Sequence, residues 1–184
     1  YQQKTIDEYR RVIQEYPKAQ DVAEFRYYLG YHLVSMGRFE EGVAAYQELV
    51  REHPESEYVP DALVNIGEFY FENNDYENAY LLYRAVEEQF PEAPIVAYAI
   101  YKQSWCHYNL GAYRDSLDRL LTVVKLADEG DRGAVELRKE ATGELMYPYS
   151  KVGKAGAAVS FFQKYAPKRF LTLASGLAAL YTEQ

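Results

Sequence analysis

The chain has 184 residues, of which 48% are hydrophobic and 26% charged, a balance typical of a folded protein rather than a disordered one. Its formal net charge of −8 disfavours nucleic acid and anionic membrane surfaces as main partners, because both favour a basic surface. No apolar run approaches the roughly 18–20 residues that span a bilayer, so we expect no direct membrane insertion by this segment.

Apolar residues recur every three or four positions between turn signals along nearly the whole chain, which predicts helices and no strand. The pattern favours nine or ten antiparallel helices of roughly 10–17 residues each. The first of them already contains Tyr1, and the turn that would follow the last one begins at Gln184. Both ends therefore predict an internal piece of a longer array.

The turn residues repeat with a spacing of 37. Pro17, Pro54 and Pro91 follow this spacing, and so do the residues of a second turn, Gly37, Asn74 and Gly111. A fixed period of about 20–50 residues is typical of a solenoid, in which each repeat buries its apolar face against its neighbours. Gly and Asn at the second turn predict helix C-caps in the left-handed conformation.

This period divides residues 1–184 into a single array. The expected repeats are about 1–17 (second helix only), 18–54, 55–91, 92–128, 129–167 (degenerate) and 168–184 (first helix only). Gly111 and Gly153 are 42 residues apart, five more than the period, and we expect the loop around Gly130–Gly133 to hold the surplus. Pro148 stands within a helical pattern and predicts a kink or short break there.

Within one repeat, the pair Leu29-Gly30 and the residues Gly42, Tyr46, Leu49 and Pro54 resemble the tetratricopeptide repeat family. The next repeat matches through Ile66-Gly67, Tyr70, Ala79, Tyr83, Val86 and Pro91. The resemblance implies an all-α fold, a right-handed superhelical solenoid of antiparallel helix pairs. Small residues at 30, 67 and 104 and at 42, 79 and 116 would let paired helices approach closely.

The resemblance also implies a function. Proteins of this family are non-catalytic scaffolds that bind a peptide or partner protein in a concave groove formed by the first helices. The three extra residues per repeat lie in 54–62, a linker similar to those of bacterial cell-envelope members, which favours the periplasm or cell envelope over the cytoplasm. An alternative is a regulatory or substrate-docking region of a larger enzyme.

The residues expected to form the groove are mostly aromatic. They are Tyr27, Tyr31, Asn65, Phe71, Tyr98, Tyr101, Lys102, Trp105 and Tyr108. Tyr and Trp are enriched among the residues that dominate binding energy at interfaces. The other interpretation is that this face packs against neighbouring repeats. Of the clamp with which some family members grip a C-terminal carboxylate, only Asn65 and Lys102 remain at matching positions.

The sequence offers no convincing catalytic, metal or cofactor site. The segment 151–155 resembles the end of a phosphate-binding loop, but Pro148 stands where Gly is required and Ala155 replaces Ser or Thr. The three histidines lie in different repeats and include no i,i+4 pair for zinc. Cys106, the single cysteine, suits a small buried apolar residue. We therefore expect no enzyme activity, no metal and no cofactor.

Overall fold

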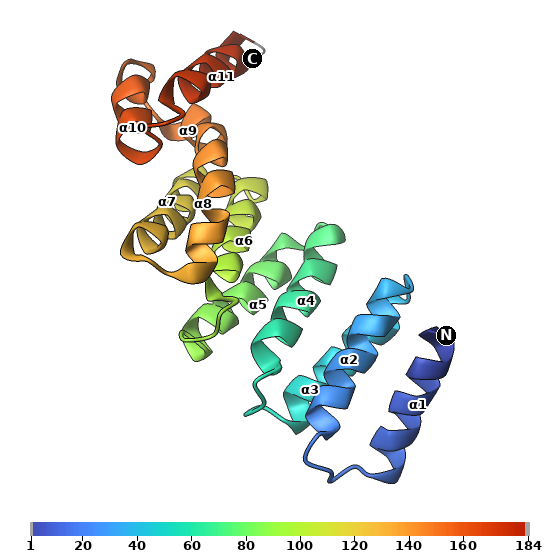
Figure 1. Ribbon diagram of the computed structural model, residues 1–184. Helices are drawn as coiled ribbons and strands as arrows, with labels where there is room; N and C mark the ends of the chain where they lie inside the picture. The colour runs from blue at the N-terminus through green and yellow to red at the C-terminus, as the bar shows by residue number, and fades with distance from the viewer. Residues whose placement is uncertain (1, 183–184) are drawn as a thin grey trace. The chain divides into compact units, whose positions relative to one another are not determined.

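The computed structural model describes residues 2–182, which contain eleven α-helices and no strand (Figure 1). The all-α class predicted from the sequence is therefore confirmed. The expectations for Tyr1 and Gln184 lie outside the described residues. The chain divides into two compact units within helix α5: a first unit of residues 2–86 and a second of residues 87–182.

The bounds of the helices follow the chain in order. They are α1 (Gln2–Glu15), α2 (Val22–Ser35), α3 (Phe39–Glu52), α4 (Val59–Glu72), α5 (Tyr76–Gln89), α6 (Val96–Asn109), α7 (Tyr113–Glu129), α8 (Arg132–Glu144), α9 (Met146–Val152), α10 (Ala158–Tyr165) and α11 (Phe170–Thr182). A short 3₁₀ turn, Ala155–Ala157, precedes α10. None of these helices is long and apolar enough to cross a membrane.

The helix boundaries repeat with the spacing of 37. Helices α2, α4 and α6 begin at Val22, Val59 and Val96, and they are the first helices of successive repeats. The second helices α3, α5 and α7 begin at Phe39, Tyr76 and Tyr113, again 37 residues apart. The helix starts therefore have the same period of 37 as the turn residues up to α7.

Each first helix ends with the predicted left-handed residue. The φ angles of Gly37, Asn74 and Gly111 are 76°, 60° and 78°. In each case the N–H of the following residue donates to a carbonyl in the last turn of the helix, as from Arg38 to Leu33 at 2.9 Å. This pattern satisfies carbonyls that would otherwise lack a partner, and it turns the chain towards the second helix.

Two glycines let the paired helices of the first unit approach closely. A Cβ atom added to Gly30 would lie 2.6 Å from the Tyr46 ring, and one added to Gly67 would lie 2.8 Å from the Tyr83 ring. The rings of Tyr46 and Tyr83 are fully buried against these glycines. The small residues that resemble those of the family therefore act as expected, by making room for the tyrosines.

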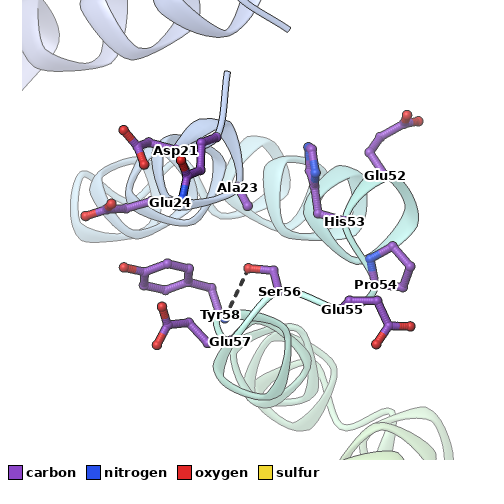
Figure 2. A pocket seen from close by; sticks show the side chains of 11 residues that line it. Asp21, Ala23, Glu24, Glu52, His53, Pro54, Glu55, Ser56, Glu57 and Tyr58 are labelled. Atoms are coloured by element: carbon purple, nitrogen blue, oxygen red, sulfur yellow. Dashed lines mark hydrogen bonds between the residues drawn. The ribbon is translucent and has the colours of Figure 1, made fainter. Parts of the chain in front are cut away.

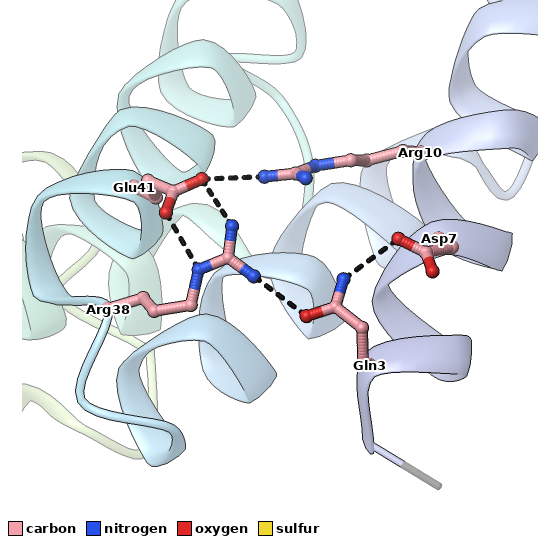
Figure 3. Close-up of polar contacts among 5 residues, drawn as sticks. All are labelled: Gln3, Asp7, Arg10, Arg38 and Glu41. Carbon is pink, nitrogen blue, oxygen red and sulfur yellow. Dashed lines mark hydrogen bonds and ion pairs between the residues drawn. The ribbon is translucent and has the colours of Figure 1, made fainter.

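A polar network joins α1 to the start of α3 in the first unit (Figure 3). Glu41 accepts two hydrogen bonds from Arg38, both 2.7 Å, and a third from Arg10 on α1, also 2.7 Å. Hydrogen bonds from Arg38 and then Arg10 lower the pKa of the Glu41 carboxyl. The Arg38 guanidinium also donates to Gln3, so it bridges the two helices.

The second unit differs from the sequence prediction. The loop between α7 and α8 contains only Gly130 and Asp131, because α7 is longer than the other second helices. The surplus residues lie later, where the expected first helix continues as two segments, α8 and α9, separated at Leu145. Pro148 lies in the first turn of α9 and has no N–H to donate to the carbonyl of Glu144, so the expected break occurs beside it. This division gives eleven helices instead of nine or ten, and α9 and α10 have only seven and eight residues.

Candidate partner-binding surface

All nine residues predicted for the groove lie on first helices. Tyr27 and Tyr31 lie on α2 and Asn65 and Phe71 on α4, all within the first unit. The remaining five lie on α6 in the second unit: Tyr98, Tyr101, Lys102, Trp105 and Tyr108. The two sets differ in the hydrogen bonds and ring contacts that their side chains make within the chain.

In the first unit, four rings form a cluster that we call the tyrosine cluster: Tyr27, Tyr28, Tyr46 and Tyr58. The ring of Tyr27 stacks on that of Tyr58, with centroids 5.2 Å apart and planes inclined by 28°. Tyr27 also lies 5.7 Å from Tyr46 and 5.4 Å from Tyr28. Such offset and edge-on arrangements are the favoured geometries of aromatic pairs.

Sequence reasoning assigned no role to two members of the cluster, Tyr28 and Tyr58. Tyr58 precedes α4 and lies in the segment interpreted only as a linker. Its signal in the sequence is weak, because the positions 37 residues before and after it hold Asp21 and Ile95, neither of which is aromatic. Ring contacts to both Tyr27 and Tyr28 fix Tyr58 against α2.

Tyr31, one helical turn beyond Tyr27, is exposed over 52% of its surface. Its ring meets the edge of His32, with centroids 5.5 Å apart, and that imidazole stacks in turn on Tyr9 of α1. A large exposed aromatic ring held by neighbouring rings is suited to bind a partner, because little side-chain freedom remains to be lost.

The two predicted residues on α4 are partly engaged within the first unit. The side-chain amide of Asn65 donates to the carbonyl of Asp61 in its own helix at 2.8 Å. Phe71 meets the ring of Tyr76 edge-on at 5.2 Å. Asn65 also lines a cavity of about 380 Å³ between α2, α3 and α4, together with the apolar side chains of Val34, Phe39 and Phe69.

In the second unit, two of the predicted rings hold a carboxylate of the same chain. The Tyr101 hydroxyl donates to one oxygen of Glu144 at 2.8 Å, and the Trp105 indole N–H donates to the other at 3.0 Å. Burial raises the pKa of Glu144, and the two hydrogen bonds oppose that rise. Burial, followed by the influence of Glu144, raises the pKa of Tyr101 to about 12.

The polar atoms of Tyr101 and Trp105 therefore join α6 to the end of α8 within the second unit. Lys102 is only 9% exposed, and its positive charge lies close enough to Glu144 to oppose the rise in the pKa of that carboxyl. Tyr98 and Tyr108 continue the row of rings, at 6.3 Å from Tyr101 and 5.6 Å from Trp105. Sequence reasoning did not find Glu144, because its partners lie about 40 residues earlier and no local pattern joins them.

An acidic cavity of about 520 Å³ lies beside the tyrosine cluster in the first unit (Figure 2). The start of α2, the end of α3 and the segment 53–58 form its walls. Its carboxylates are those of Asp21, Glu24, Glu52, Glu55 and Glu57. Figure 2 shows Glu24 on α2 facing Tyr58 and Glu57, which immediately precede α4. Tyr58 thus belongs to the tyrosine cluster and also lines the cavity.

Comparison with known proteins agrees with the helix repeats. A family model described as tetratricopeptide repeat matches residues 6–57 and, overlapping with them, residues 27–94. A search of curated proteins finds no significant match. Within residues 2–182, no group of three or more His, Cys, Asp or Glu side chains is arranged to hold a metal ion.

Proposed function

We propose that this chain, whose residues 6–94 belong to the tetratricopeptide repeat family, is a non-catalytic scaffold that binds a partner protein or peptide in the groove formed by its first helices. Repeats of this family generally mediate interactions between proteins, because stacked helix pairs present a long surface. The partner is expected to use one part of that surface more than the rest.

One observation carries the proposal: Tyr31 is half exposed beside the partly buried tyrosine cluster on the same helix, α2. Ring packing around Tyr27 makes this part of the surface rigid, while the exposed ring of Tyr31 offers apolar area to a partner. Rigid aromatic anchors of this kind supply much of the binding energy in protein interfaces.

In the second unit, two of the predicted aromatic residues have polar atoms that are already hydrogen-bonded within the chain. Tyr101 and Trp105 donate their hydrogen bonds to Glu144 within the chain, so their ring faces, not their polar atoms, remain for a partner. We therefore propose α2 and α4 of the first unit as the docking surface, and we treat the ring faces of α6 as a separate apolar surface of the second unit.

The proposed setting is a bacterial cell-envelope complex. The linker 54–62 supports it through its similarity to the linkers of envelope members of the family. Cell fractionation of the native host with an antibody to the chain tests the setting: recovery with the periplasm or envelope agrees with it, and recovery with the cytosol contradicts it.

The docking surface is tested by alanine substitution at two equally exposed apolar residues. Tyr31→Ala removes the proposed anchor, and Leu81→Ala, on the second helix α5 with 55% exposure, is the matched control. We expect Tyr31→Ala to weaken binding of a captured partner about thirtyfold, the effect of losing roughly 2 kcal/mol, and Leu81→Ala to leave it unchanged. Loss of binding with Leu81→Ala but not with Tyr31→Ala would move the site to the second helices.

A further inference from the structure

We infer that the first unit holds a subsite for a cationic side chain of the partner, an arginine or lysine, formed by Tyr27, Tyr58, Asp61 and Glu24. This inference rests on the proposed function, because it assigns the chemistry of the partner group that docks on the same face. Four features support it: the ring geometry, an unpaired carboxylate, a buried hydroxyl without a partner and the charge of the unit.

The aromatic part of the subsite is the stacked pair of Tyr27 and Tyr58, with Tyr28 edge-on to both rings at 5.4 and 6.2 Å. The negative faces of tyrosine rings attract a guanidinium or ammonium group, and arginine also stacks flat on them. Both rings contact neighbouring rings, so binding of a cation would cost little side-chain conformational entropy.

Asp61 supplies the negative charge. It lies in the first turn of α4, close enough to raise the pKa values of Tyr27 and Tyr46, for both of which burial is the larger cause. Burial also raises the pKa of Asp61 itself, and only its own backbone N–H opposes that rise. Among the described residues, no Lys or Arg pairs with it. A half-buried carboxylate without a cation is the feature that a cationic ligand would complete.

The ring of Tyr46 contacts that of Tyr27, and its hydroxyl has no hydrogen-bond partner although the residue is fully buried. In the next repeat the matching residue, Tyr83, donates to Glu68 at 2.7 Å. The residue that matches Glu68 in the repeat of Tyr46 is Tyr31, so the acceptor is missing. The first of these two repeats thus has a buried hydroxyl without a hydrogen-bond partner at the base of the tyrosine cluster, next to Tyr27.

The charge of the first unit favours a basic partner. Residues 1–86 contain 16 acidic and eight basic residues, whereas residues 87–184 contain twelve of each, so the whole net charge of −8 belongs to the first unit. Glu24 joins the subsite to the acidic cavity, whose other carboxylates would attract further basic residues of the same partner. This distribution steers a basic segment towards the rings.

The inference is tested with the full chain labelled with ¹⁵N and two tripeptides, acetylated Gly-Arg-Gly-amide and the same peptide with citrulline. Citrulline keeps the length and planar end of arginine but lacks the positive charge. We expect saturable shifts of the amide signals of residues 24–31 and 58–61 with the arginine peptide, with a dissociation constant in roughly the millimolar range. The citrulline peptide should bind about tenfold more weakly.

Two variants locate the site. Asp61→Asn keeps the shape of the side chain and should weaken binding of the arginine peptide about tenfold, and Tyr58→Leu should weaken it severalfold. Glu77→Gln on α5 removes the same charge from the same unit at an exposed position and should leave binding unchanged. Circular dichroism of each variant verifies folding.

Three results would overturn the inference: no saturable shift, equal binding of the two peptides, or equal weakening by Asp61→Asn and Glu77→Gln. The last result would mean that only the general charge of the unit attracts cations. None of them bears on the Tyr31→Ala test, so the scaffold proposal stands or fails separately. If Tyr31→Ala has no effect while the arginine peptide binds as expected, the subsite is present but the partner uses another face.

Discussion

At the scale of single residues, the two repeats of the first unit differ in how they satisfy one buried tyrosine. Tyr46 and Tyr83 occupy matching positions and pack against matching glycines. Only Tyr83 has an acceptor for its hydroxyl, because Glu68 stands where the preceding repeat has Tyr31. The two rings therefore pack in the same way, but only the hydroxyl of Tyr83 makes a hydrogen bond.

This difference predicts opposite effects of the same substitution. Tyr83→Phe removes a hydrogen bond and should lower the free energy of unfolding by about 1 kcal/mol. Tyr46→Phe removes a hydroxyl that has no partner, so the free energy of unfolding should stay the same or rise. Urea denaturation followed by circular dichroism measures both. Equal losses for the two variants would show that the hydroxyl of Tyr46 is satisfied in solution.

The raised pKa of Asp61 predicts how stability depends on pH. The folded chain holds the Asp61 proton more tightly than the unfolded chain, whose carboxyl has the ordinary pKa of 3.8, because burial penalises the charged form. This stabilising contribution is present below pH 3.8 and is lost as pH rises through the folded pKa.

Asp61→Asn, which has no proton to lose, should therefore be more stable than the native chain near neutral pH, and the difference should shrink as the pH falls towards 3.8. Urea denaturation of both proteins across this range provides the measurement. A difference that stays constant with pH would argue that the Asp61 carboxylate is solvated.

At the scale of elements, the break at Leu145 and the carboxylate of Glu144 organise the second unit. Glu144 is the last residue of α8, and its oxygens receive the N–H of Trp105 and the hydroxyl of Tyr101 from α6. One side chain thus joins a regular repeat to the irregular helices that follow it. The core around this junction includes the buried side chains of Leu145, Tyr149 and Phe162.

The role of Glu144 can be measured through the single tryptophan of the chain. Trp105 lies in the second unit, so its fluorescence during urea denaturation reports on that unit. Glu144→Ala leaves two donors without their acceptor and should lower the free energy of unfolding by about 1–3 kcal/mol. Glu144→Gln, which keeps an acceptor oxygen, should cost less.

The control for this experiment is Glu136→Ala, an exposed carboxylate on the same helix that should have almost no effect. If Glu144→Ala were as mild as Glu136→Ala, the hydrogen bonds to Glu144 would contribute nothing to the junction.

Elements with strong turn signals could be predicted from sequence, and the others could not. Gly37, Asn74 and Gly111 each require or tolerate a positive φ, so the ends of α2, α4 and α6 were evident. The longer α7 and the short loop after it were missed, since no local rule says that a helix continues for another turn before Gly130. Pro148 indicated a break, and its missing N–H accounts for the interruption at Leu145, three residues earlier.

The predicted site shows the same limit. The helical period, projected from Leu29-Gly30 and Ile66-Gly67, placed all nine residues on first helices, where the structure has them. It could not separate the exposed Tyr31 from Trp105, whose N–H is held by Glu144, since that contact joins residues 39 positions apart. It also missed Tyr58, which precedes α4 in the linker, outside the repeating pattern of the groove.

At the scale of the whole molecule, charge and chemistry are divided between the two units. The first carries the net charge of −8, the tyrosine cluster and the acidic cavity, whereas the second is neutral overall. Binding of a basic partner should therefore weaken as ionic strength rises, because salt screens the carboxylates of the first unit.

The central claim is that a partner docks on the first-helix face of the first unit, and site-specific photo-crosslinking tests it most directly. The full chain, with p-benzoylphenylalanine in place of Tyr31 or, separately, of Leu81, is irradiated in the presence of the partner. These two positions have nearly equal exposure on the first and second helices. We expect a crosslinked complex from position 31 and none from position 81; crosslinking from position 81 alone would contradict the claim.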